Sequence, residues 1–194
     1  METTTQSLAF QQLSNYAKQK VIAEYGQPPD DWYEEIYARA KEDAPARGFS
    51  INEIQFNGFH SQGDGASWTG YVDLADFIEY HNDPDAKDFA QYVVLRELIR
   101  DGWCEEKVNV NRHAFYYSHS GTMVTEGLDD RIDYADDDSV MDRGILEGAN
   151  VKELANSIDT DHLFNDLDGW VLSRARAYAD GIYKQLKEEY EAYT

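Results

Sequence analysis

Three glycines and five polar side chains lie between residues 58 and 68, and His60, Gln62 and Asp64 are among them. A histidine beside a carboxylate can act as a general base that its partner orients, and glycines let the backbone approach a ligand closely. We therefore predict a ligand-binding loop that consists of Gln62, Gly63, Asp64, Gly65 and Ser67. If the loop is catalytic, His60 and Asp64 supply the chemistry, and His119 joins them from a second hairpin. The pattern selects no reaction class.

The same loop has a purely structural interpretation. Asp64 and Gly65 form an Asp-Gly pair between two apolar runs, which is a strong signal of a hairpin turn. Turn glycines are far more common than catalytic loops. A phosphate-binding loop is disfavoured, because no Lys-Ser or Lys-Thr follows the glycines and the segment contains no Lys or Arg.

Metal and cofactor chemistry have weak support. His113 and His119 share the parity of one predicted strand, and His60 could approach them from the other hairpin. Scattered histidines are more often surface or hydrogen-bonded core residues, so we predict no metal site and no cofactor. Cys104 is followed by two glutamates, which raise a thiol pKa and disfavour a thiolate nucleophile.

The charge of the chain restricts its partners. The 38 Asp and Glu residues against 17 Lys and Arg give a formal net charge of -21. Such a field disfavours direct binding to nucleic acid or to anionic membranes, and it favours a partner protein with a basic surface. The predicted contact is an exposed acidic loop over residues 126–142, through Asp129, Asp130, Asp133, Asp136, Asp137 and Asp138. Two further acidic surfaces are predicted, one around Glu34 and one around Glu188.

A second explanation of the charge stays open. Charge runs are usually solvated faces with no partner, and an acidic surface is also typical of proteins from a salty cytosol. The single cysteine permits no internal disulfide, and there is no signal sequence or long apolar run, so we predict a cytoplasmic protein.

The periodicity predicts the elements that carry these residues. Apolar residues recur at helical spacing over 10–21, 32–40, 89–99 and 163–190, with Asp83-Pro84 read as the start of the third helix. Residues 51–59 and 68–74 predict a hairpin around the glycine-rich loop. Residues 103–125 predict another, with Val108 and Val110 on one face and a turn at Ser120-Gly121. Phe115, Tyr117 and His119 are expected on its other face.

These elements predict one domain over residues 1–194, of the α+β class. We expect a small, mostly antiparallel sheet that is flanked by helices, with the longest helix at the C-terminus. Aromatic residues of that helix, such as Trp170 and Tyr190, exceed what one buried stripe needs, so a docked partner or a homodimer is a further possibility.

The segment from Ile54 to Gly70, with its core Ser-Gln-Gly-Asp-Gly-Ala-Ser-aromatic, resembles the signature of a protein group of tailed bacteriophages and prophage regions. The aromatic helix around Trp32, the segment 117–120 and the run 183–190 resemble that group in the same order. The chain departs from it in having Trp68 where Phe is usual, and in the acidic stretch at 136–138. The resemblance implies a phage setting in a host cytoplasm and transfers no catalytic role.

The hypothesis that follows is a phage accessory protein without enzymatic activity. Its acidic surface would imitate DNA and inhibit a basic host protein, such as a nucleic-acid-binding defence or transcription factor. The alternative is a small-ligand-binding protein or an enzyme that uses the loop from His60 to Asp64.

Overall fold

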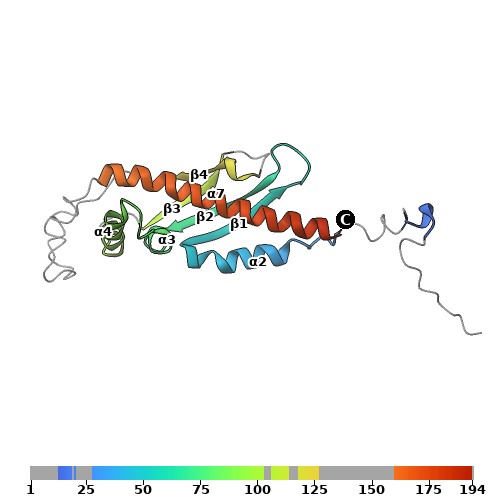
Figure 1. Cartoon of the computed structure of the whole chain (residues 1–194), viewed down its shortest axis with the longest axis horizontal. Helices are drawn as coiled ribbons and strands as arrows, with labels where there is room; N and C mark the ends of the chain where they lie inside the picture. Colours follow the sequence, from blue (N-terminus) through green and yellow to red (C-terminus); the bar gives the residue numbers. More distant parts are fainter. Residues whose placement is uncertain are drawn as a thin grey trace, which may run out of the picture.

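The computed structural model describes residues 13–18, 20, 28–102, 106–113, 118–126 and 160–193. Its centre is a four-stranded antiparallel sheet in the order β1-β2-β3-β4. The long helix α7 (Thr160–Tyr193) lies across one face of the sheet, as Figure 1 shows. The predicted α+β class, with its small antiparallel sheet and long C-terminal helix, is confirmed.

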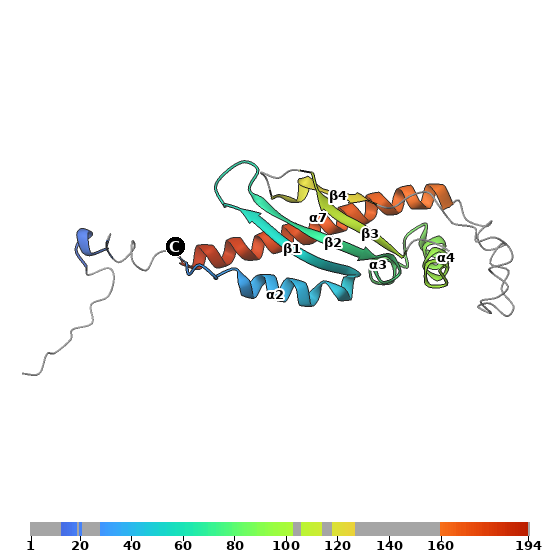
Figure 2. The same ribbon diagram turned by 180° about the vertical axis from the view of Figure 1, so that it is seen from behind.

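The sheet is formed by β1 (Phe49–Asn57), β2 (Gly65–Asp73), β3 (Lys107–Arg112) and β4 (Met123–Glu126). The register pairs Phe49 with Val72 and Ile54 with Trp68, and all four side chains are buried on the side of α7. The alternate positions of β1 carry polar residues, which point to the face of the sheet opposite α7. Figure 2 shows that no described helix covers this opposite face. The sheet is therefore apolar on one side and polar on the other.

A bulge interrupts β1 near its middle. The register shifts between Ile51 and Glu53, so Asn52 is the extra residue. The ammonium of Lys41 donates a hydrogen bond to the Asn52 carbonyl at 2.8 Å. The bulge thus lies where α2 runs along the edge of the sheet.

Helix α2 (Glu34–Asp43) buries Ile36 and Ala40, which confirms the predicted apolar stripe. A single 3-10 turn, η2 (Pro45–Arg47), follows it and ends at Gly48. Gly48 has a φ of +78°, and a Cβ built there would lie 2.4 Å from the Phe77 backbone nitrogen. Both the left-handed backbone and the close approach of α3 require glycine at this position.

The prediction for residues 68–100 was wrong at two points. Leu74 does not continue β2 but begins α3 (Leu74–His81). The N-cap of α3 is Asp73, whose side chain accepts a hydrogen bond from the Asp76 backbone N–H. Asp83 does not start α4 (Phe89–Arg100), because it accepts from the Asp85 N–H in a separate turn. The predicted strand over 68–74 thus extends one residue into α3, and the rest of this short helix was not predicted because eight residues show little helical period.

The second predicted hairpin is present as β3 and β4, with Val108 and Val110 buried on the side of α7. Ser120–Thr122 forms a 3-10 turn, η3, between the two strands. His119 precedes this turn and is not in a strand, so its predicted strand parity was wrong. Phe115 and Tyr117 lie outside the described residues.

Helix α7 confirms the predicted C-terminal helix. Its buried residues recur every three or four positions and pack on the sheet, namely Leu163, Leu167, Val171, Ala175, Ala179, Ile182 and Leu186. Of the first predicted helix, residues 15–18 and 20 are described and helical. Of the predicted acidic loop over 126–142, only Glu126 is described, at the end of β4.

None of the helices in the described ranges combines the length and the apolar character that crossing a membrane requires.

Candidate functional site

The predicted glycine-rich loop is closed by its own carboxylate. Asp64 Oδ2 accepts hydrogen bonds from the backbone N–H groups of His60 at 2.7 Å and of Ser61 at 2.6 Å. The Asp64 N–H donates back to the Ser61 carbonyl at 3.1 Å, and Gly63 has a φ of +105°. This is the arrangement of an Asp-centred turn. Asp64 therefore has a structural role in the turn that connects β1 to β2.

The structure separates the other predicted loop residues. Gln62 and His60 are exposed, and the His60 ring lies 6.5 Å from the ring of Tyr190 on α7. His119 lies against Gly65 instead, because a Cβ on Gly65 would be 2.5 Å from His119 Cβ. Within the described residues, no hydrogen bond or ring contact joins His119 to His60 or Asp64.

Ser67 lies on the polar face of the sheet and is 1% exposed. Its Oγ has no hydrogen-bond partner within the described part of the chain. Beside it, the Arg112 guanidinium donates to Gln55 Oε1 and, at 3.2 Å, to Ser118 Oγ. No group of three or more His, Cys, Asp or Glu side chains in the described ranges is arranged to hold a metal ion.

Three aromatic rings meet where the start of α2, the β1–β2 loop and the end of α7 converge, on the right in Figure 1. The ring centroids of Trp32 and Tyr190 are 5.8 Å apart, those of Phe59 and Tyr190 are 4.9 Å apart, and those of Trp32 and Phe59 are 6.1 Å apart. All three side chains are half-buried. Aromatic rings that keep part of their surface exposed are typical of contact sites.

Carboxylates adjoin Trp32 and Tyr190 in the sequence. Asp30, Asp31, Glu34 and Glu189 are exposed, and none of them has an ion-pair partner among the described residues. Glu188 forms only a loose pair, with its carboxylate 3.8 Å from the Lys184 ammonium. We call this surface the acidic aromatic end; it consists of Asp30, Asp31, Trp32, Glu34, Phe59, Glu188, Glu189 and Tyr190.

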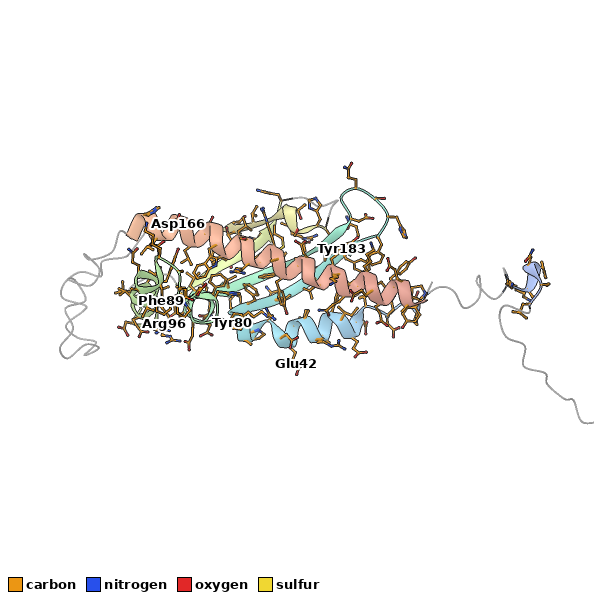
Figure 3. All side chains as sticks on the ribbon, viewed as in Figure 1. Glu42, Tyr80, Phe89, Arg96, Asp166 and Tyr183 are labelled. Carbon is orange, nitrogen blue, oxygen red and sulfur yellow. The ribbon has the colours of Figure 1, made fainter. Side chains whose placement is uncertain are left out.

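Tyr183 connects α7 to the glycine-rich loop. Its hydroxyl donates to the Gly58 carbonyl at 3.2 Å, and Figure 3 shows it on α7 beside that loop. Burial raises the pKa of Tyr183, and the negative charge of Asp64 raises it further. The phenol therefore stays protonated and keeps its donor role at neutral pH.

A second candidate site is a cavity of about 280 Å³ between α2, η2, α3 and α7. Its lining includes Arg39, Arg47, His81, Arg174, Tyr178 and Gly181, together with the carboxylate of Asp43. Three of the twelve lining residues are Arg, whereas Lys and Arg together make up only 17 of the 194 residues. We call this site the arginine-lined cavity.

Two of its arginines lack a carboxylate partner. Arg39 is paired with Glu35 at 2.9 Å, but Arg47 and Arg174 form no ion pair within the described residues. The Arg47 guanidinium lies 5.4 Å from the ring centroids of both Tyr80 and Tyr178. Tyr178 is itself fixed, because its hydroxyl donates to the Ala40 carbonyl at 2.7 Å. These contacts hold the Arg47 side chain in one position.

His81 lines the same cavity. Burial lowers the pKa of His81 to about 4, and the positive charges of Arg174 and Arg47 contribute to the decrease. The ring is therefore neutral at pH 7. Its Nε2 is buried and has no hydrogen-bond partner among the described residues.

The sequence pattern did not predict this cavity. Its ionisable residues come from three separated stretches of the chain, around positions 39–47, 81 and 174, and none of them belongs to a spaced motif. Nothing in the sequence around His81 or Arg47 indicates that the fold brings these two residues into one cavity. The one signal available was the scarcity of Arg in so acidic a chain.

No curated protein and no solved structure matches this chain. Residues 32–194 match the family described as a domain of unknown function, DUF8835. The match begins at the Trp32 of the acidic aromatic end and includes the sheet, the arginine-lined cavity and α7. The chain therefore belongs to the DUF8835 family.

Proposed function

We propose that this chain is a binding protein whose acidic aromatic end docks onto a basic surface of a partner protein. The observation that carries the proposal is the contact between Trp32, Phe59 and Tyr190, which are half-buried. Next to Trp32 and Tyr190 in the sequence are exposed carboxylates that form no ion pair among the described residues. Interfaces commonly combine an aromatic centre with a polar rim. The carboxylates attract a basic surface, and the rings supply the apolar contact area.

The resemblance to a bacteriophage protein group supports a bacterial host protein as the partner. A groove that normally holds nucleic acid is basic and releases counterions when carboxylates replace phosphates. We accordingly propose that the chain acts in the host cytoplasm as a DNA mimic that inhibits a nucleic-acid-binding defence or transcription protein. The predicted contacts through Asp129, Asp130, Asp133, Asp136, Asp137 and Asp138 lie outside the described residues and stay predictions.

Capture from a bacterial lysate with matched variants tests this proposal. The first variant is Asp31→Asn/Glu34→Gln/Glu189→Gln, which removes three unpaired carboxylates of the acidic aromatic end. The control is Asp76→Asn/Asp85→Asn/Asp101→Asn, which removes the same charge around α3 and α4. Both variants change the net charge equally, so only the position differs.

We expect one basic protein to bind the wild type and the control, and to be released by the first variant. The same protein should dissociate when salt is raised to about 0.5 M, because screening shortens the range of its attraction to carboxylates. Equal loss in both variants would show that bulk charge alone retains the protein, and would contradict docking at this end. Retention by both variants would contradict it as well.

A second candidate function is favoured by Ser67, whose buried Oγ has no partner. Such a hydroxyl beside Arg112 and Gln55 can take part in binding a small polar ligand. Ser67→Ala would then lower ligand affinity without lowering stability, and a gain in stability with no ligand found in a metabolite screen would count against it.

A further inference from the structure

The arginine-lined cavity concentrates positive charge in a chain that has little of it. The guanidinium groups of Arg47 and Arg174 both act on His81, since both lower its pKa. Their charges therefore act on the same small space, and within the described residues no ion pair neutralises either of them. The lining also contains one carboxylate, that of Asp43, so its three arginines outnumber its acidic residues. An anion bound between the guanidinium groups would lower their mutual repulsion.

We propose that the arginine-lined cavity binds the phosphate group of a small organic phosphate. Guanidinium groups present several donors in a fixed plane and form paired hydrogen bonds to oxyanions. Arg47 is already held by Tyr80 and Tyr178, so little side-chain freedom is lost when it binds. Arg174 is exposed on α7, lines the same cavity and supplies the second guanidinium.

The charge of the ligand favours a phosphate over a carboxylate. A phosphate monoester has its second pKa near 6, so at neutral pH it carries close to two negative charges, whereas a carboxylate carries one. The larger charge suits the guanidinium groups of Arg47 and Arg174, which form no ion pair among the described residues. His81 is neutral in the cavity wall and adds no positive charge of its own.

The size and the walls of the cavity restrict the rest of the ligand. A volume of about 280 Å³ is just below the range of roughly 300–1,000 Å³ that small-molecule sites span, so only a small ligand fits. Phe49 and Ile182 supply apolar surface. A polymeric anion is excluded by the net charge of -21, because it would meet the negative field of the whole chain. The ligand class is therefore a phosphate on a small, partly apolar molecule.

Gly181 keeps the cavity accessible from α7. It lies within the helix, is exposed, and a Cβ built there meets no atom within 4 Å. Gly169 lies in the same helix with equally open space around its Cβ, but it does not line the cavity. The pair offers a matched test, since the same substitution at both positions has the same effect on the helix.

The test is calorimetric titration of the full chain with phenyl phosphate, with benzoate and inorganic phosphate as comparison ligands. We expect phenyl phosphate to bind at least ten-fold more tightly than benzoate. Arg174→Gln should weaken binding by about ten-fold or more, because it removes one charged donor pair. Gly181→Glu should abolish binding, because it places a carboxylate in the cavity.

Two control variants should bind as the wild type does. Arg96→Gln removes the same charge as Arg174→Gln, from a residue on α4 that Figure 3 labels and that does not line the cavity. Gly169→Glu adds the same charge to α7 as Gly181→Glu. Circular dichroism and the thermal midpoint show whether each variant is folded, and Arg174→Lys replaces Arg174→Gln if the latter is not.

Three results would overturn the proposal: no binding of phenyl phosphate at about 10 mM, binding that Arg174→Gln leaves unchanged, or benzoate binding as tight as phenyl phosphate. A loss that Arg96→Gln or Gly169→Glu causes equally would overturn it too. None of these results bears on the acidic aromatic end, whose test measures a protein partner.

Discussion

The indole Nε1 of Trp68 donates a hydrogen bond to the backbone carbonyl of Ala175 at 3.1 Å. Trp68 is fully buried in the middle of β2, and Ala175 is fully buried in the middle of α7. The Trp68 ring also lies 5.4 Å from the ring of Phe49 on β1. One side chain thus connects two strands to the helix that covers them.

Trp68→Phe should lower the free energy of unfolding by about 2 kcal/mol, because it removes buried ring volume and the hydrogen bond to α7. Urea unfolding followed by circular dichroism measures the change. Trp170→Phe is the control, because Trp170 is half-buried and donates no hydrogen bond among the described contacts. An equal loss in the two variants would contradict a special role for the Trp68 bond.

The stability of the protein should depend on pH through His81. Its pKa is about 4 in the folded state and about 6.5 in the unfolded state, so between these values the unfolded chain binds more protons. The His81 contribution is therefore fully present above about pH 6.5 and is lost as the pH falls toward 4. Allowing for solvent screening of a half-buried ring, we expect the contribution to be about 2 kcal/mol.

The measurement is the difference in unfolding free energy between wild type and His81→Gln at several pH values from 4 to 7.5. The difference isolates His81 from the many carboxylates that titrate in the same range. As the pH falls, the unfolding free energy of the wild type should decrease relative to that of His81→Gln. Parallel curves for the two proteins would show that His81 titrates equally in both states.

Asp64→Ala should destabilise the protein by about 1–2 kcal/mol, because two backbone N–H groups lose their acceptor. Asp64→Asn should cost less, since an amide oxygen can still accept from both donors. Urea unfolding of the two variants gives the comparison. If Asp64→Asn abolished a ligand-dependent signal while leaving stability unchanged, Asp64 would be a binding residue and the structural role would be wrong.

Gly48→Ala should cost several kcal/mol or prevent folding, because a Cβ there would lie 2.4 Å from the Phe77 backbone nitrogen. Gly102 has the same φ of +78° at the end of α4 and is exposed. Gly102→Ala therefore measures the backbone strain alone, which we expect to be about 1 kcal/mol. Thermal unfolding separates the two effects, and similar midpoints for the two variants would contradict the predicted clash.

The sequence predicted the elements whose period is long and clear. Helices α2 and α7 follow from apolar residues at helical spacing, and the first hairpin follows from its aromatic and β-branched strands around the Asp-Gly pair. Helix α3 was not predicted, because all four of its first apolar residues are buried and an eight-residue segment of that kind resembles a strand. Its cap at Asp73 was the only local signal.

The candidate sites were less predictable than the elements. Asp64 was singled out because its neighbours are polar, but the chain uses the carboxylate to close its own turn. Arg174 and His81 are 93 positions apart, and only packing of α7 against α3 brings them to one cavity. Local sequence patterns carry no information about such an encounter, which depends on tertiary contacts.

Helix α7 also has a consequence for synthesis of the protein on the ribosome. It supplies the cover for the apolar side of the sheet, and it is the last described element to be translated. Until residues 160–193 emerge, the nascent chain lacks the helix that covers Phe49, Trp68 and Val110. The growing chain must therefore expose these side chains during translation, and it is then a substrate for chaperones that recognise apolar segments.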